Sequence, residues 1–203
     1  MAIYPLAAPL LPARPALRRS RLPPAAGPVR PRIEAETNAR LADLSDCRVV
    51  AVAGEDAGLV LATLLARHQH ATGLASEGTQ LDAADAFPGV APRIRLRQGE
   101  ATALPPRGAD AYVLKRLLAV RYDAAAIELL TQCRARVSRH ARLLIAETVA
   151  VRDWLGDLAG WFAARGARIR TLDEIAELLR RAGFAAQRYE PHPAIDLVEA
   201  MPA

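Results

Sequence analysis

Residues 47–77, CRVVAVAGEDAGLVLATLLARHQHATGLASE, constrain the fold more than any other stretch of this chain. The valine-rich run at 48–53 predicts a strand buried on both faces, and the small, acidic run at 54–58 predicts a turn. Leucine and alanine then form a wide apolar helical surface over 59–66, and residues 72–76 predict a second strand that ends on Glu77. This is a β-α-β unit whose turn directs backbone N–H groups at a ligand and whose acid, Glu77, lies where a ribose could bind.

The remaining segments extend the same alternation. A helix is expected over 33–44, a short helix over 80–86, strands over 94–98, 109–114 and 141–148, helices over 124–137, 151–164 and 171–182, and a closing strand pair over 184–189 and 195–200. Asp123 is expected to cap the helix that follows it, and Thr171 with Glu174 forms a capping-box pattern before a helix that stops at Gly183. The pattern predicts an α/β fold with a mostly parallel sheet, helices on both faces and an antiparallel closing strand.

In such a sheet the ligand binds at the carboxyl ends of the central strands. The residues at those ends are Gly54, Glu77, Glu100, Lys115 and Glu147. They are the first candidates for a binding site.

The charge distribution argues against nucleic acid as a partner. The formal net charge is +5, but residues 1–33 carry six arginines and no acid, which leaves 5 − 6 = −1 for the rest. Eight prolines in that first segment oppose regular structure, so residues 1–33 are expected to be a disordered arm and residues 34–203 one α/β domain. A basic surplus confined to a tail does not predict a nucleic-acid-binding domain.

Cysteine and histidine usage predicts neither disulfides nor a metal site. Cys47 and Cys133 do not form a spaced pair, which indicates free thiols in a reducing cytoplasm. His68 and His70 lack a third ligand at metal-binding spacing, so no metal is expected. No apolar run approaches the length of a membrane span, so neither a membrane partner nor a membrane location is expected.

Several segments resemble S-adenosylmethionine-dependent O-methyltransferases of the plant caffeate and bacterial polyketide type. The most specific is GADAYVLKRLL at 108–118, followed by CRARVSRHARLLIAET at 133–148 and RTLDEIAELLRRAGF at 170–184, in the family's order. The resemblance covers about residues 34–203 and implies a Rossmann-like class I methyltransferase fold. The family's N-terminal dimerisation domain has no counterpart, so a monomer, or a chain that depends on a partner, is expected.

The resemblance also implies a binding mode for S-adenosylmethionine. The family's glycine-rich turn falls on residues 53–57, where Gly54 is the one family glycine kept, and its ribose-binding acid falls on Glu77. The family's Gly-Asp pair near the adenine falls on Gly99 and Glu100, followed by Ala101, and its lysine falls on Lys115. An alanine forced to positive φ in this turn would cost about 1 kcal/mol or more, and Glu55 could repel the cofactor's carboxylate.

The catalytic pattern departs from the family. The family's general-base histidine falls on Ala119, and of the two glutamates that orient it one falls on Glu147 and the other on Ile169. A phenol has a pKa of about 10, so a base assists methyl transfer at neutral pH. The resemblance therefore leaves Glu147 as the catalytic candidate.

Simpler structural interpretations remain beside these assignments. The turn at 54–58 also fits an ordinary strand–helix connection, Glu77 and Glu100 also fit solvated surface acids, and Lys115 also fits a side chain that snorkels from a strand end. Trp154, Trp161 and Phe162 fit a helix core as well as a substrate pocket.

Two functional hypotheses follow. The first is an enzyme that methylates a hydroxyl of a small, secondary-metabolite-type molecule with weak or altered chemistry. The second is a catalytically inactive methyltransferase-fold partner or regulatory subunit, which the losses at Ala119 and Ile169 and the eroded glycine turn favour. A third class, a nicotinamide-binding Rossmann domain, disagrees with the missing glycines and the closing strand pair.

Overall fold

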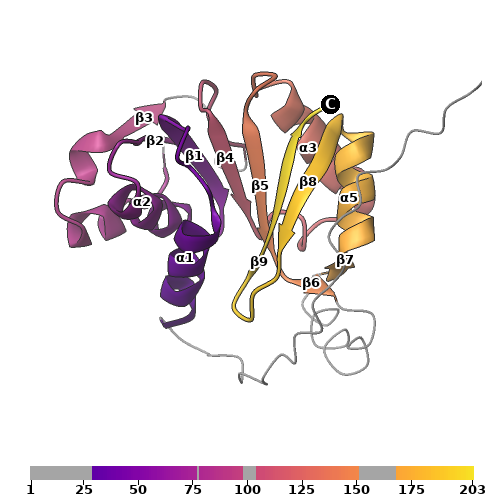
Figure 1. Cartoon of the computed structure of the whole chain (residues 1–203), viewed down its shortest axis with the longest axis horizontal. Coiled ribbons are helices and arrows are strands. Elements are labelled where there is room, and N and C mark those ends of the chain that lie inside the picture. Colours follow the sequence, from indigo (N-terminus) through magenta and orange to yellow (C-terminus); the bar gives the residue numbers. More distant parts are fainter. Residues whose placement is uncertain (1–28, 77, 98–103, 151–167) are drawn as a thin grey trace, which may run out of the picture.

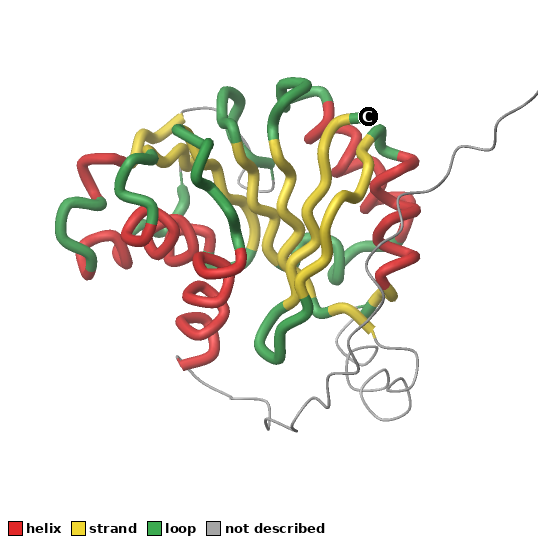
Figure 2. Tube along the Cα trace, viewed as in Figure 1, coloured by secondary structure: helices red, strands yellow, loops and turns green. Residues whose placement is uncertain are grey.

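A computed structural model describes residues 29–76, 78–97, 104–150 and 168–203. Within those ranges a seven-stranded sheet forms the centre of the molecule, with strand order β3-β2-β1-β4-β5-β9-β8 (Figures 1 and 2). The parallel strands are β1 (Val49–Gly54), β2 (Thr72–Ser76), β3 (Ile94–Arg97), β4 (Ala111–Lys115) and β5 (Arg142–Glu147). The closing pair, β8 (Phe184–Glu190) and β9 (Asp196–Pro202), runs antiparallel, which confirms the predicted fold class.

Helices cover both faces of the sheet. Helices α1 (Val29–Leu41) and α2 (Ala57–Arg67) pack on one face, and α3 (Asp123–Arg134) and α5 (Leu172–Arg181) pack on the other (Figure 1). Strand β5 shows why, because Leu143 and Ile145 enter the α3–α5 core while Leu144 and Ala146 enter the α1–α2 core. No helix in the described ranges is long and apolar enough to cross a membrane.

Element boundaries follow the sequence closely, with a few differences. The first helix begins at Val29 rather than 33, and the segment predicted as a helix at 80–86 is a 3₁₀ helix, η1 (Asp82–Ala86), followed by a second, η2 (Ala91–Arg93). A two-stranded sheet of β6 (Val149–Ala150) and β7 (Arg170–Thr171) was not predicted. The helix predicted over 151–164, with its tryptophans, lies outside the described residues.

The two predicted helix caps have opposite outcomes. Thr171 and Glu174 form the full capping box at the start of α5, and Gly183, at φ 82°, follows that helix. The prediction for Asp123 is wrong, because Tyr122 is the N-cap of α3 and Asp123 is the first helical residue. The Asp123 carboxylate instead binds the guanidinium groups of Arg168 and Arg170, which stabilises an acid in the first turn and ties it to the segment before α5.

Parallel strands β1, β4 and β5 end at one edge of the sheet. Gly54 pairs with Lys115, and Lys115 pairs with Ala146, so the three strand ends are level. One residue further, Glu147 pairs with Asp196 at the start of β9. This edge therefore brings together the chain segments that the sequence singled out.

Arg93 fastens the end of α2 to the turn before β3. Its guanidinium donates to the carbonyl oxygens of Leu65 (2.6 Å), Ala71 (2.9 Å), Gln69 (3.1 Å) and His68 (3.2 Å), and its Nε donates to that of Gly89. Leu65 lies in the last turn of α2, where carbonyl groups lack helical partners, and the other three of these acceptors lie in the connection between α2 and β2. One cation thus joins the end of the helix to the segment that follows it.

We expect Arg93→Ala to lower the free energy of unfolding by about 2 kcal/mol, because several carbonyl oxygens lose a charged donor. Urea denaturation measures the change. The control is Arg95→Ala, since Arg95 is exposed on the edge strand β3. Equal stabilities of the two variants would contradict the role of Arg93.

Candidate active site at the sheet edge

The turn after β1 places its positive-φ positions on residues that tolerate them. Gly54 has φ 109° and Asp56 has φ 52°, whereas Ala53 and Ala57 have no positive φ. A Cβ on Gly54 would lie 2.0 Å from the carbonyl oxygen of Lys115, so strand contact as well as φ requires glycine here. The alanines that replace family glycines therefore add no backbone strain.

A cavity of about 460 Å³ opens beside this turn. Its walls come from the end of β1, the start of α2, the segment after β2 and the 3₁₀ helix η1. The lining residues are Gly54, Asp56, Ala57, Gly58, Leu59, Gly78, Thr79, Gln80, Asp82 and Ala83. Gly58 keeps the two sides of the cavity together, because a Cβ there would lie 1.7 Å from the Gln80 carbonyl oxygen.

Lys115 connects the turn to helix α1. Its side chain is fully buried, and its Nζ lies 3.0 Å from Oε2 of Glu34 and 2.9 Å from Oδ2 of Asp56. The snorkelling interpretation of Lys115 is therefore wrong. A buried ammonium needs such partners, because an unpaired charge in the interior would cost several kcal/mol.

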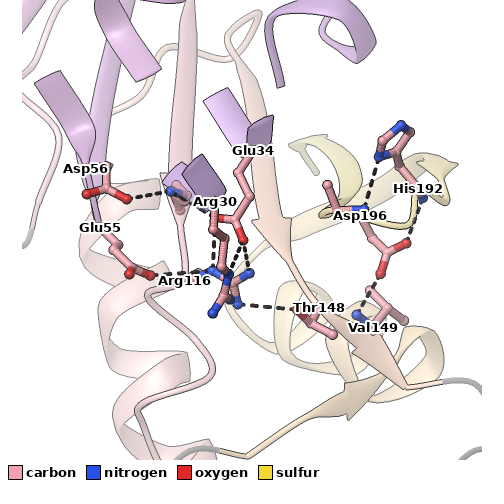
Figure 3. A network of polar contacts seen from close by, with 11 residues as sticks. Arg30, Glu34, Glu55, Asp56, Arg116, Thr148, Val149, His192 and Asp196 are labelled. Atoms are coloured by element: carbon pink, nitrogen blue, oxygen red, sulfur yellow. Dashed lines mark hydrogen bonds and ion pairs between the residues drawn. The ribbon is translucent and has the colours of Figure 1, made fainter. Parts of the chain in front are cut away.

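Arg116, the next residue, neutralises the second acid of the turn. It has φ 53°, and its guanidinium contacts Glu34 (2.5 Å), Glu55 (3.4 Å) and Thr148 (3.3 Å; Figure 3). Burial alone would raise the pKa of Glu34, but the hydrogen bond and charge of Arg116, helped by Lys115, hold it below its usual value. The charge of Glu55 is likewise balanced by Arg116.

Glu147 is a buried carboxyl group with one unused oxygen. Its Oε1 accepts hydrogen bonds from the backbone N–H groups of Leu118 (2.8 Å) and Ala119 (3.2 Å). Its Oε2 is buried and has no partner among the described residues. Burial raises the pKa of Glu147 to about 7, although the two N–H groups and the charges of Arg116 and Arg170 oppose the rise.

Arg170 holds the other side of the segment after β4. This buried guanidinium donates to the carbonyl oxygens of Leu118 and Arg121, both at 2.6 Å, and to Asp123. The backbone N–H of Arg168 adds a bond to the carbonyl oxygen of Ala119. The loop that carries Ala119 is thus fixed from both sides by charged groups.

The structure brings together some of the predicted site residues. Gly54, Lys115 and Glu147 meet at the ends of β1, β4 and β5, whereas Glu77, Glu100 and Ala101 lie outside the described residues. Within the described ranges, no group of three or more His, Cys, Asp or Glu side chains could hold a metal ion.

Sequence reasoning missed Glu34, Arg116 and Arg170. Glu34 lies 81 positions before Lys115 in the chain, and nothing in the local pattern of α1 indicates that pair. Arg170 is the first residue of segment 170–184, which resembles the O-methyltransferase family, and it directly precedes the capping box. That position is the signal in the sequence that could have indicated a role for Arg170.

Comparison with known proteins identifies the family of this chain. A family model described as an O-methyltransferase domain matches residues 81–185. The chain belongs to this family. An O-demethylpuromycin-O-methyltransferase of Streptomyces alboniger is 32% identical over 173 residues, which cover 76% of this chain and 45% of that protein.

Solved structures of this family share the fold. LaPhzM superposes with a TM-score of 0.70 at 28% identity, covering 83% of this chain and 55% of that one. An O-methyltransferase of neocarzinostatin biosynthesis, solved with S-adenosylhomocysteine and 1,4-dihydroxy-2-naphthoic acid, superposes with a TM-score of 0.65 at 26% identity, covering 84% and 52%. The chain thus spans about half the length of the relatives it matches.

Burial of Glu147 makes a prediction about stability and pH. The pKa of Glu147 rises from 4.5 to about 7 on folding. The stability that the native chain gains from the protonated carboxyl group is therefore fully present below pH 4.5 and is lost as the pH rises to about 7. Glu147→Gln keeps an oxygen for the two backbone N–H groups and removes the ionisation. We expect the variant to gain stability relative to the native chain across this interval, by roughly 3 kcal/mol at its upper end.

Urea unfolding of both proteins across the pH interval measures this difference. The matched control is Glu199→Gln, the same substitution on the neighbouring strand β9, where the side chain is 15% exposed beside Arg142. A constant difference between Glu147→Gln and the native chain at all pH values would contradict the burial of an ionisable group.

Proposed function

We propose that this chain binds S-adenosylmethionine and transfers its methyl group to a hydroxyl of a small molecule. The observation that carries the proposal is the cavity beside the Gly54 turn, in a chain that belongs to the O-methyltransferase family. The turn is the segment on which the family's cofactor motif falls, and the cavity lies at the carboxyl edge of the sheet, where α/β folds bind ligands.

The residues around the cavity fit this cofactor. The free backbone N–H groups at the start of α2 suit its carboxylate, and the carboxylate of Asp82 suits its positively charged groups. Arg116 balances Glu55, which removes the repulsion that the sequence suggested. By resemblance, Glu77 would hold the ribose, and Glu100 with Ala101 would lie near the adenine.

When bound, the cofactor supplies an electrophilic methyl group, and the chain's own residues position the two reactants. Lys115 fixes the turn against β4, and Arg170 with Glu147 fixes the loop on the acceptor side. Such positioning supplies a large part of catalysis in a two-substrate reaction. As the acceptor class we propose small hydroxylated aromatic molecules, like the 1,4-dihydroxy-2-naphthoic acid in the structure of the neocarzinostatin-biosynthesis relative.

A second candidate is a catalytically inactive partner or regulatory subunit with the same fold. Ala119 and Ile169 favour it, because neither side chain can accept a proton. The two candidates differ in turnover, which only the enzyme shows.

We expect the full chain to bind S-adenosylmethionine and S-adenosylhomocysteine with micromolar affinity in calorimetric titration. Ala57→Leu should weaken binding at least about tenfold, because the larger side chain fills the cavity that Ala57 lines. Ala91→Leu, the same change at an exposed position outside the cavity, should bind like the native chain. Folded protein that binds neither ligand at millimolar concentration would refute the proposed function.

A further inference from the structure

Glu147 differs from the other carboxylates around the ends of β1, β4 and β5, because one of its oxygens is both buried and unpaired. The others in this region are held by cations or by backbone N–H groups. They are Glu34, Glu55, Asp56, Asp123, Glu174 and Asp196. Among the described residues here, Oε2 of Glu147 is the carboxylate oxygen that is buried and unpaired.

One oxygen of the Glu147 carboxyl group holds the side chain in place, and the other oxygen has no hydrogen-bond partner among the described residues. Strand β5 and the two bonds at Oε1 hold the carboxyl group against the backbone of Leu118 and Ala119. Glu147 itself is 3% exposed, whereas Val120, two residues after its hydrogen-bond donor Leu118, is 60% exposed, so the loop that Glu147 holds reaches the molecular surface.

We propose that Glu147 is a catalytic residue whose Oε2 takes the proton from the phenolic hydroxyl that is methylated. This inference rests on the proposed function, including its aromatic acceptor class, and adds the proton acceptor to it. The O–H bond breaks and its proton moves to Oε2. The oxygen bonds to the methyl carbon of the sulfonium donor, whose C–S bond breaks with both electrons remaining on sulfur, and the proton later passes to water.

The acidity of Glu147 suits a phenol. Its pKa of about 7 makes proton transfer from a phenol, with a pKa of about 10, uphill by about three powers of ten. For an ordinary glutamate the transfer would be uphill by more than five. Two cations face the carboxyl group and favour its ionised form, namely Arg116 from the end of β4 and Arg170 from β7. Asp196 on β9 pairs with Glu147 in the sheet, and its carboxylate accepts hydrogen bonds from the backbone N–H groups of Val149 and His192.

The test compares two phenols of different acidity with the native full chain, Glu147→Gln and the control Glu199→Gln. The probes are 4-methylphenol, an ordinary phenol, and 4-nitrophenol, whose nitro group makes it acidic enough that a substantial fraction is already ionised near neutral pH. Mass spectrometry measures the methyl ether formed from S-adenosylmethionine, and calorimetry measures cofactor binding. We expect Glu147→Gln to lose at least about 100-fold in rate with 4-methylphenol and to lose little with 4-nitrophenol. Glu199→Gln should match the native chain with both.

A second readout does not require turnover. Carbon-13 NMR of glutamate carboxyl groups in the full chain should show one signal that titrates near pH 7 and disappears in Glu147→Gln. With the native chain, the methylation rate of 4-methylphenol should rise across the same pH range.

Three results would overturn the inference. One is an equal loss of rate with both phenols in Glu147→Gln, which indicates a structural role alone. The second is no methylation of either phenol by a chain that binds the cofactor, and the third is a Glu147 signal that titrates like an ordinary glutamate. Failure of the native chain to bind S-adenosylmethionine is a different result, because it refutes the proposed function itself.

Discussion

The buried ammonium of Lys115 is the contact on which the rest of the candidate site depends. It joins Glu34 of α1 and Asp56 of the turn after β1 at the end of β4, so three segments that are distant in the sequence share one charge. Each carboxylate would be costly to bury alone, and the lysine would be costly without them. The turn therefore keeps its shape although only one family glycine remains, because Asp56 occupies a left-handed position while its side chain is held by Lys115.

Charged side chains also fix the loop after β4, where Ala119 stands at the position of the family's histidine. Arg170 binds the carbonyl groups of the loop after β4, and Glu147 binds its N–H groups. The loop thus has a defined position without depending on the side chain of residue 119. A carboxyl group that performs this structural task with one oxygen leaves the other buried and without a partner among the described residues, and that oxygen is the one we propose as the proton acceptor.

The sequence predicted the fold well because its signals are local. Valine-rich buried runs, the turn at Gly54 and the capping box at Thr171 specify their elements within a few residues, and strand ends place Lys115 and Glu147 at one edge. The pairing of Lys115 with Glu34 could not be predicted, because a lone lysine after a strand looks the same whether it is buried or snorkels. The prediction that Asp123 caps α3 failed for a similar reason, since its partners Arg168 and Arg170 lie 45 and 47 positions away in the sequence.

Hydrogen–deuterium exchange of the native chain and of Lys115→Met tests most directly whether one buried charge organises the site. Methionine has a similar length and no charge, so it leaves Glu34 and Asp56 without their shared cation. We predict faster exchange in both α1 and the 54–57 turn, with α5 on the opposite face of the sheet unchanged. Unaltered exchange in α1 and the turn, or a uniform increase over all elements, would contradict the account.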